Sequence, residues 1–117
     1  MPGPYELYLI RHGIAEERGP EWPDDGRRPL TEKGISRLKK STKGLVSLGV
    51  TFDVLLTSPL LRARQTAETV AACFEPRPPV VAIDSLSPDG TYQQVLDDLG
   101  KQSRRSRIAL VGHEPSL

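Results

Sequence analysis

The feature of this 117-residue sequence that most constrains its fold is the alternation of short β-type runs with helical patterns. Four runs are predicted to be strands: Glu6–Ile10, Val54–Thr57, Val80–Ile83 and Arg107–Val111. Alternation of this kind is typical of a largely parallel central sheet flanked by helices. We therefore expect an α/β fold and one domain over residues 1–117, a length near the commonest domain size.

The first predicted helix follows Thr31, a good N-cap, and ends at Gly49. Its periodicity turns four apolar side chains inward: Ile35, Leu38, Leu45 and Leu48. The third predicted helix spans Tyr92–Leu99, with Thr91 as its cap and Gly100 as its stop.

The second predicted helix has Ser58 as its N-cap and Pro59 at its first position, where the missing N–H costs nothing. One face carries Ala63, Ala67, Val70 and Phe74, and Pro76, Pro78 and Pro79 then lead into the third strand. Cys73 is expected near the end of this helix, as a packing residue.

Composition excludes several classes of protein. The formal charge of +1, from 16 Lys and Arg against 15 Asp and Glu, argues against a broad nucleic-acid-binding face. A single cysteine forms no internal disulfide and no cysteine-based metal cluster, which agrees with a reducing compartment. No secretory signal and no apolar run of the roughly 20 residues that span a bilayer are visible. We therefore expect a cytoplasmic protein without a membrane anchor.

A polar segment between Gly13 and Pro29 is longer than an ordinary connection, and is therefore either functional or mobile. Its Trp22 either covers a site or anchors the segment. Four carboxylates crowd within it and resemble a metal site only superficially: Glu16, Glu17, Asp24 and Asp25. We expect no metal there.

Polar groups follow three of the predicted strands. The first strand runs into Arg11-His12-Gly13, the second into Ser58 and the helix that carries Arg62, and the fourth into Gly112-His113. In open α/β sheets, ligands bind in the crevice beyond the carboxyl ends of the strands. Arg62 in the first helical turn points back at this edge, because helical side chains lean toward the N-terminus of their helix.

These residue types together suit a phosphoryl group. Two arginines that face one pocket repel each other unless an anion joins them, and the planar guanidinium matches phosphate oxygens. One neutral imidazole can attack phosphorus, and a second can donate hydrogen bonds to its oxygens. The N-terminus of the second helix adds positive potential.

Three motifs, in order and each after a predicted strand, resemble the histidine phosphatase superfamily, also called phosphoglycerate mutase-like. They are Leu9-Ile10-Arg11-His12-Gly13, the run from Ser58 to Ala67, and Val111-Gly112-His113. Within it, Arg28-Pro29-Leu30-Thr31 with Gly34, and the run from Leu86 to Gly90, resemble the small SixA-type phosphohistidine phosphatases. Arg64 is expected to be a solvated helix residue.

The resemblance implies that His12 becomes phosphorylated, and that Arg11, Arg62 and His113 clamp the phosphoryl oxygens. Gly13 and Ser58 complete the expected substrate site, with no metal and no cofactor. The implied partner is a phosphohistidine-carrying signalling or phosphotransfer protein. The basic run Lys101, Arg104, Arg105 and Arg107 is expected to be a solvated linker, and guidance of an acidic partner is the alternative.

Two departures from the family pattern bear on function. Ester-cleaving relatives use a glutamate after the third strand as general acid, whereas this chain has no glutamate between Glu75 and Glu114. That favours phosphohistidine, whose imidazole leaves more easily than an alkoxide. A phosphomonoesterase, with Asp84 or Asp89 as the acid, is the first alternative, and a phosphate-sensing or protein-binding module without turnover is the second.

The second departure is the position of the last residue. The chain ends four residues after His113, so a C-terminal helix and strand are expected to be missing.

Overall fold

The computed structural model describes residues 6–11, 13, 15–17, 19–86, 91–100 and 107–112. Within these residues, four parallel strands form one sheet in the order β1-β4-β2-β3, where β1 is Glu6–Arg11, β2 is Val54–Thr57, β3 is Val80–Ala82 and β4 is Arg107–Gly112. The predicted parallel α/β sheet is therefore confirmed, with strand ends within one residue of their expected positions.

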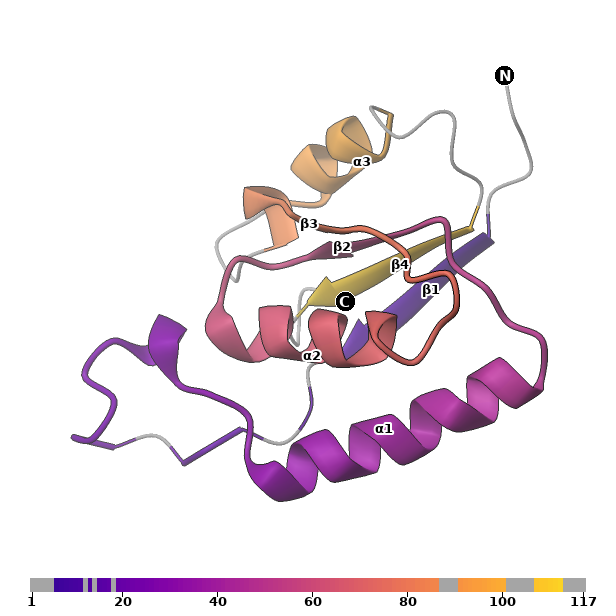
Figure 1. The fold of residues 1–117 in the computed structure, drawn as a ribbon. Coiled ribbons are helices and arrows are strands. Elements are labelled where there is room, and N and C mark those ends of the chain that lie inside the picture. Colours follow the sequence, from indigo (N-terminus) through magenta and orange to yellow (C-terminus); the bar gives the residue numbers. More distant parts are fainter. Residues whose placement is uncertain are drawn as a thin grey trace.

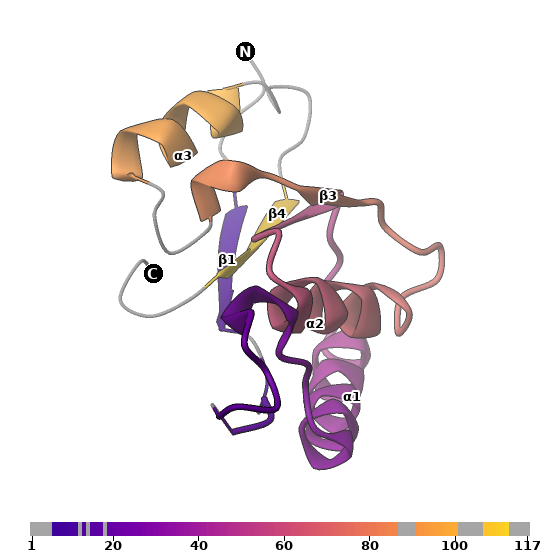
Figure 2. The ribbon, with the colours of Figure 1, turned by 90° about the vertical axis from the view of Figure 1, so that its left-hand side faces the viewer.

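Helices cover both faces of this sheet. Helices α1 (Glu32–Ser47) and α2 (Leu61–Ala71) lie on one face, and α3 (Tyr92–Gly100) lies on the other (Figures 1 and 2). Two short 3-10 helices, η1 (Asp25–Arg27) and η2 (Asp84–Leu86), precede α1 and α3. Among the described helices, none combines the length and the apolar composition that crossing a bilayer requires.

Each face of the sheet has its own hydrophobic cluster, because neighbouring residues of a strand point to opposite sides. On the α2 face, Leu55 and Val111 pack with the inner side of α2, whose buried residues include those predicted: Ala63, Ala67 and Val70, together with Phe74 beyond the helix. On the α3 face, Leu56 and Ile108 pack with Leu86 of η2 and with partly buried residues of α3.

Helix α1 begins as predicted, with the Thr31 hydroxyl accepting a hydrogen bond from the Gly34 N–H at 2.9 Å. Its inward face was predicted only in part. Leu38 packs against the core, but Leu48 is 80% exposed, because it is the C-cap and the chain turns away at Gly49, whose φ is 81°. The fully buried positions are the small residues Gly34 and Thr42, which allow α1 to approach α2.

The predicted start of α2 is wrong by two residues. Leu60, not Ser58, is the N-cap, so Pro59 precedes the helix. Ser58 still belongs to the edge of the sheet, since its N–H donates to the Val111 carbonyl at 2.9 Å, and its hydroxyl accepts from the Leu60 N–H at 3.2 Å. The helix begins once the chain has left the sheet, and Arg62 remains in its first turn.

The second half of the chain follows the prediction more closely. The Thr91 hydroxyl caps α3 by accepting from the Gln94 N–H at 3.2 Å, and Gly100 is the last helical residue. Cys73 lies in the turn after α2 rather than in the helix. Its half-buried thiol donates to the Thr69 carbonyl and packs against the α2-side core, as expected of a packing residue.

Candidate functional site

The carboxyl ends of β1, β2 and β4 meet at one edge of the sheet. Arg11, the last residue of β1, is paired with Gly112, the last residue of β4. Ser58, directly after β2, is hydrogen-bonded to Val111 of β4. The described parts of the three motifs therefore lie at adjacent strand ends, at the end of the sheet that the β1 and β4 arrowheads mark in Figure 1.

A hydroxyl joins the loop after β1 to α2. Thr66 Oγ1 accepts a hydrogen bond from the Gly13 N–H at 3.0 Å and donates one to the Arg62 carbonyl at 2.8 Å. Thr66 is fully buried, so both contacts are shielded from water. Gly13 and Arg62, which sequence motifs placed in the same site, are thus connected through one side chain.

Arg62 is only 4% exposed, and its guanidinium meets the η1 turn. Nη1 donates to the Asp25 carbonyl at 2.8 Å, and Nη2 donates to the Asp25 carboxylate at 3.1 Å. The other oxygen of that carboxylate accepts from Nε of Arg28 at 2.9 Å. One carboxylate therefore bridges two buried arginines, at the edge where a phosphoryl group was expected.

The polar segment before α1 is held at its base as well as at η1. Ala15 and Leu30 form an isolated antiparallel bridge, and the Glu16 N–H donates to the Pro29 carbonyl at 2.8 Å. The Leu30 N–H donates to the Gln65 side chain on α2 at 2.7 Å. These contacts anchor the described part of the segment to its own base and to α2.

Within this segment, Trp22 is half-buried beside Pro23, Asp24 and Arg27 around a surface hollow. The structure thus places Trp22 against its own segment, and its predicted roles as cover or anchor stay open. In the described part of the chain, no three His, Cys, Asp or Glu side chains group closely enough to hold a metal ion.

Four of the predicted site residues lie in the described part of the chain, and the structure adds three residues whose contacts were not predicted. Arg11, Gly13, Ser58 and Arg62 lie at or next to the expected edge, whereas His12 and His113 lie outside the described residues. The roles of Asp25, Arg28 and Thr66 were not predicted. A signal for Thr66 existed, because it follows Arg62 by four residues and so shares its helix face.

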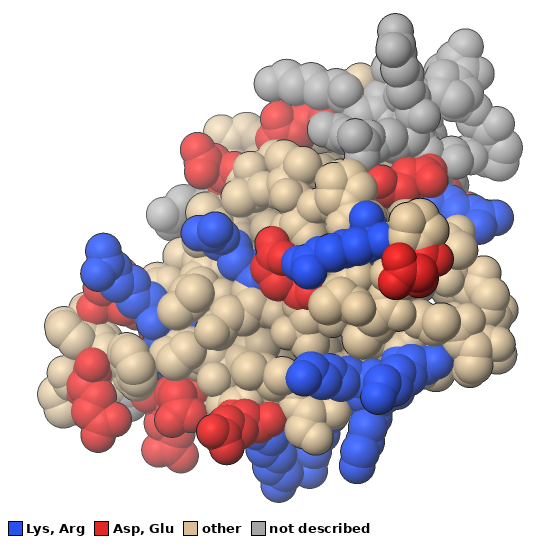
Figure 3. Space-filling view, in the orientation of Figure 1, with Lys and Arg blue, Asp and Glu red and all other residues tan. Residues whose placement is uncertain are grey.

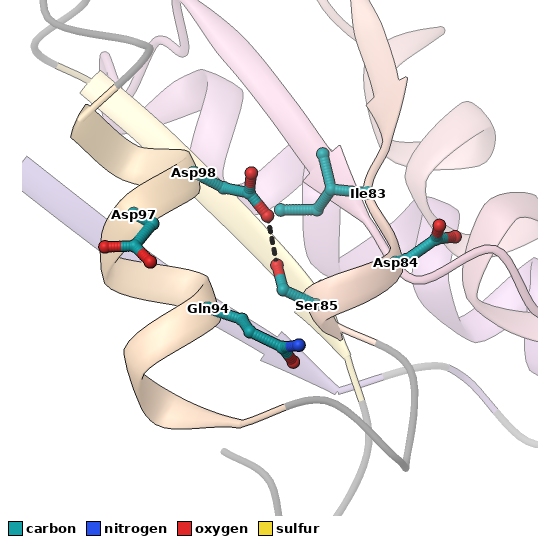
Figure 4. Close-up of a pocket in the computed structure, with 6 residues that line it drawn as sticks. All are labelled: Ile83, Asp84, Ser85, Gln94, Asp97 and Asp98. Carbon is teal, nitrogen blue, oxygen red and sulfur yellow. Dashed lines mark hydrogen bonds between the residues drawn. The ribbon is translucent and has the colours of Figure 1, made fainter.

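The alternative acid Asp84 follows the end of β3 and also lines a hollow on the α3 face. It is exposed at the start of η2 and borders a hollow of about 390 Å³ on the α3 face, together with Asp97 and Asp98 (Figure 4). In this hollow the Ser85 hydroxyl donates to the Asp98 carboxylate at 2.5 Å. Asp89, the other candidate acid, lies outside the described residues.

Charge is unevenly distributed on the face shown in Figure 3. Basic side chains gather along α1, which carries five cations and one carboxylate: Lys33, Arg37, Lys39, Lys40, Lys43 and Glu32. Arg64 is exposed on α2, as predicted. Of the predicted basic run, Arg107 is described, and its Nη1 donates to the Thr51 hydroxyl; residues 101–106 lie outside the described part.

The sequence of this chain is similar to those of known proteins. Residues 7–87 match the sequence model of the histidine phosphatase superfamily (branch 1). An uncharacterised protein of Picosynechococcus sp. is 45% identical over 115 residues, which are 96% of this chain and 68% of that protein. The phosphohistidine phosphatase SixA of Escherichia coli is 28% identical over 116 residues, 94% of this chain and 68% of the relative.

A solved structure agrees with these sequence matches. The protein histidine phosphatase SixA complexed with tungstate superimposes with a TM-score of 0.81 at 27% identity, covering 93% of this chain and 69% of that one. The family match covers nearly all of β1, both helices of the α2 face and the ends of β1, β2 and β3, whereas β4 lies beyond it. The chain therefore belongs to the histidine phosphatase superfamily (branch 1), and SixA phosphatases are among its relatives in both sequence and fold.

Proposed function

We propose that this protein removes the phosphoryl group from a phosphohistidine side chain of a partner protein, through a covalent phosphoenzyme on His12. The observation that carries the proposal is the meeting of the three motif-bearing strand ends, in which Arg11 pairs with Gly112 and Ser58 bonds to Val111. The SixA relatives support the choice of substrate, since the Escherichia coli protein is a phosphohistidine phosphatase.

The proposed reaction has two displacements at phosphorus. A ring nitrogen of His12 attacks in line, a P–N bond to His12 forms, and the P–N bond to the substrate imidazole breaks. Water then attacks phosphorus, a P–O bond forms and the P–N bond to His12 breaks, so that inorganic phosphate leaves, a proton of the water passes to solvent and His12 returns to its neutral form. Arg11, Arg62 and His113 stabilise the charge on the phosphoryl oxygens, because phosphoryl transfer depends chiefly on positioning and on electrostatic stabilisation.

The leaving group explains why this site needs no glutamate acid. A phosphoimidazole that is protonated on its other nitrogen departs as a neutral ring, and imidazole has a conjugate-acid pKa of about 6.5. An alkoxide is a far stronger base and requires a proton from a general acid. We therefore propose a metal-independent phosphatase that prefers phosphoramidates to alkyl phosphates.

Trapping of the intermediate tests the nucleophile. After brief reaction with a phosphohistidine protein and a denaturing quench, we expect a phosphoenzyme that is labile in acid and stable in base. His12→Ala should abolish it, whereas Cys73→Ser should not, because Cys73 packs in a turn after α2. Phosphate trapped on another residue, or full turnover in His12→Ala, would remove His12 from the mechanism.

The phosphomonoesterase alternative has one observation in its favour. Asp84 follows β3, and the neighbouring Ile83 N–H donates to the Thr57 carbonyl at 2.8 Å, so Asp84 comes just after a strand end at the same edge. If Asp84 is the acid, Asp84→Asn should lower turnover of alkyl phosphates far more than that of phosphohistidine. Unchanged alkyl phosphate turnover in this variant would dismiss Asp84 as the acid.

A further inference from the structure

Asp25 is bonded to both buried arginines near the motif-bearing edge. Its two carboxylate oxygens serve different partners: Oδ1 accepts from Arg28 Nε at 2.9 Å and Oδ2 accepts from Arg62 Nη2 at 3.1 Å. Its backbone carbonyl accepts a third bond, from Arg62 Nη1 at 2.8 Å. Two different nitrogens of Arg62 are therefore tied to one residue, which fixes the plane of the guanidinium.

Burial makes these contacts strong. The side chains of Arg62 and Arg28 are 4% and 10% exposed, whereas the Asp25 side chain is 47% exposed. In both ion pairs the arginine is therefore the group that has lost its water. Each arginine needs an anionic partner more than Asp25 needs a cationic one. Arg28 is held at its other end as well, because its Nη1 donates to the Glu16 carbonyl at 2.7 Å.

We propose that Asp25 is a positioning residue, which holds the Arg62 guanidinium in the orientation that receives the phosphoryl group, and that Arg28 in turn holds Asp25. The inference rests on the proposed function, in which Arg62 clamps the phosphoryl oxygens. An arginine binds phosphate through a planar fork, so a guanidinium with a fixed plane meets the phosphoryl oxygens without a search among side-chain rotamers.

Because Asp25 acts through Arg62, its loss should lower kcat more than it lowers anion affinity. Small misplacements of a catalytic group cost rate steeply, and we expect kcat of Asp25→Ala to fall about 10- to 100-fold. Removal of a carboxylate also makes the pocket more cationic, which offsets weaker anchoring. The dissociation constant for tungstate should therefore change by less than about threefold.

The neighbouring Asp24 supplies the matched control. Its carboxylate caps the same turn by accepting from the Gly26 N–H at 3.0 Å, and its ion partner is the exposed Arg27 at 3.7 Å. Asp24→Asn keeps an oxygen for this cap and removes one negative charge from the same turn. It should leave kcat within about twofold of wild type, because surface substitutions away from a buried contact have small effects.

Guanidinium NMR with labelled arginine measures the positioning without any turnover. Arg62→Lys assigns the signal, and the rate of rotation about the guanidinium C–N bonds reports how firmly the group is held. We expect slow rotation of Arg62 in wild type and in Asp24→Asn, and rotation about tenfold faster in Asp25→Ala. Asp25→Asn, which can accept from only one arginine at a time, should fall between them.

The two readouts separate failure of this inference from failure of the proposed function. Fast rotation in Asp25→Ala with unchanged kcat, or equal losses in Asp24→Asn and Asp25→Ala, would overturn the positioning role while the enzyme stays active. Tighter tungstate binding with undiminished kcat in Asp25→Ala would instead make Asp25 a competitor of the phosphoryl group. If wild type lacks turnover, the proposed function fails, and the catalytic role of Asp25 fails with it even where rotation is slow.

A double-mutant cycle tests the part assigned to Arg28. Arg28→Ala should lower kcat in wild type by up to about tenfold, but should have little effect in the Asp25→Ala background, since coupled residues are not additive. Additive losses would contradict action through Asp25. Thermal unfolding of each variant establishes that the folded protein is being compared.

Discussion

On the α2 side of the sheet, β1 turns Tyr8 and Ile10 toward a packed core, whereas on the α3 side the same strand leaves Leu7 and Leu9 48% and 60% exposed. The contacts that join the site run through the packed side, from Gly13 to Thr66 and on to Arg62. The rival acid Asp84 borders a hollow on the α3 side. The difference teaches that Arg62 is supported by the better-covered face of the sheet, as a precisely placed catalytic group requires.

The largest expected effect is on the free energy of unfolding, and it differs between two leucines on opposite faces of the sheet. Leu55→Ala should lower the free energy of unfolding by about 2–5 kcal/mol, because Leu55 is fully buried under α2 and its loss leaves a cavity. Leu9→Ala should change it by less than about 0.5 kcal/mol, since that side chain is mostly in water. Urea denaturation measures both. Equal losses would show that the α3 side of β1 is covered after all.

The second largest effect is the loss of stability when the hydrogen bond between the loop after β1 and α2 is removed. Thr66→Val keeps the shape of the side chain but leaves the Gly13 N–H without its oxygen, and a buried unsatisfied donor costs about 1–3 kcal/mol. Thr69→Val is the control, because the Thr69 hydroxyl bonds within its own helix, to the Gln65 carbonyl at 2.7 Å. Urea denaturation should show the larger loss of stability in Thr66→Val. A larger loss in Thr69→Val would mean that the contact with Gly13 contributes little.

The smallest effect concerns Tyr8, which faces the packed side. Its hydroxyl donates to Glu6 Oε2 at 2.9 Å, and this bond raises the pKa of the phenol above its usual value of 10.0. A raised pKa means that the contribution to stability is present below about pH 10 and is lost as the pH rises through the folded-state value. Glu6→Gln should lower the Tyr8 pKa in an ultraviolet titration. An unchanged value would exclude the bond as the cause.

Much of the fold could be predicted from sequence, because strands and helices here follow local patterns. Thr31 and Thr91 are caps by residue type, and Ala63 and Ala67 follow helical spacing into the core. The start of α2 could not be read in this way. Ser58 has every local feature of an N-cap, but its bond to Val111, a residue far along the chain, keeps it at the edge of the sheet, and the helix begins only after Leu60.

For the site, the sequence predicted which strand ends meet, whereas the roles of its residues, including His12 and His113, stay predictions. Motif residues at strand ends come together by topology, which the order of elements already indicates. Asp25 could not be identified, because its neighbour Asp24 has the same residue type and only the path of the η1 turn decides which carboxylate meets Arg62. Contacts between a loop and a helix depend on tertiary packing and have no periodic signature.

Phosphate release from two matched substrates tests the central claim most directly. A protein phosphorylated on histidine and one phosphorylated on serine are compared at equal concentration, with and without a chelator of divalent metal ions. We expect release from phosphohistidine to be much faster, and to be unchanged by the chelator, because an imidazole leaves without a general acid. Faster release from phosphoserine, or loss of activity with the chelator, would contradict a metal-independent phosphohistidine phosphatase.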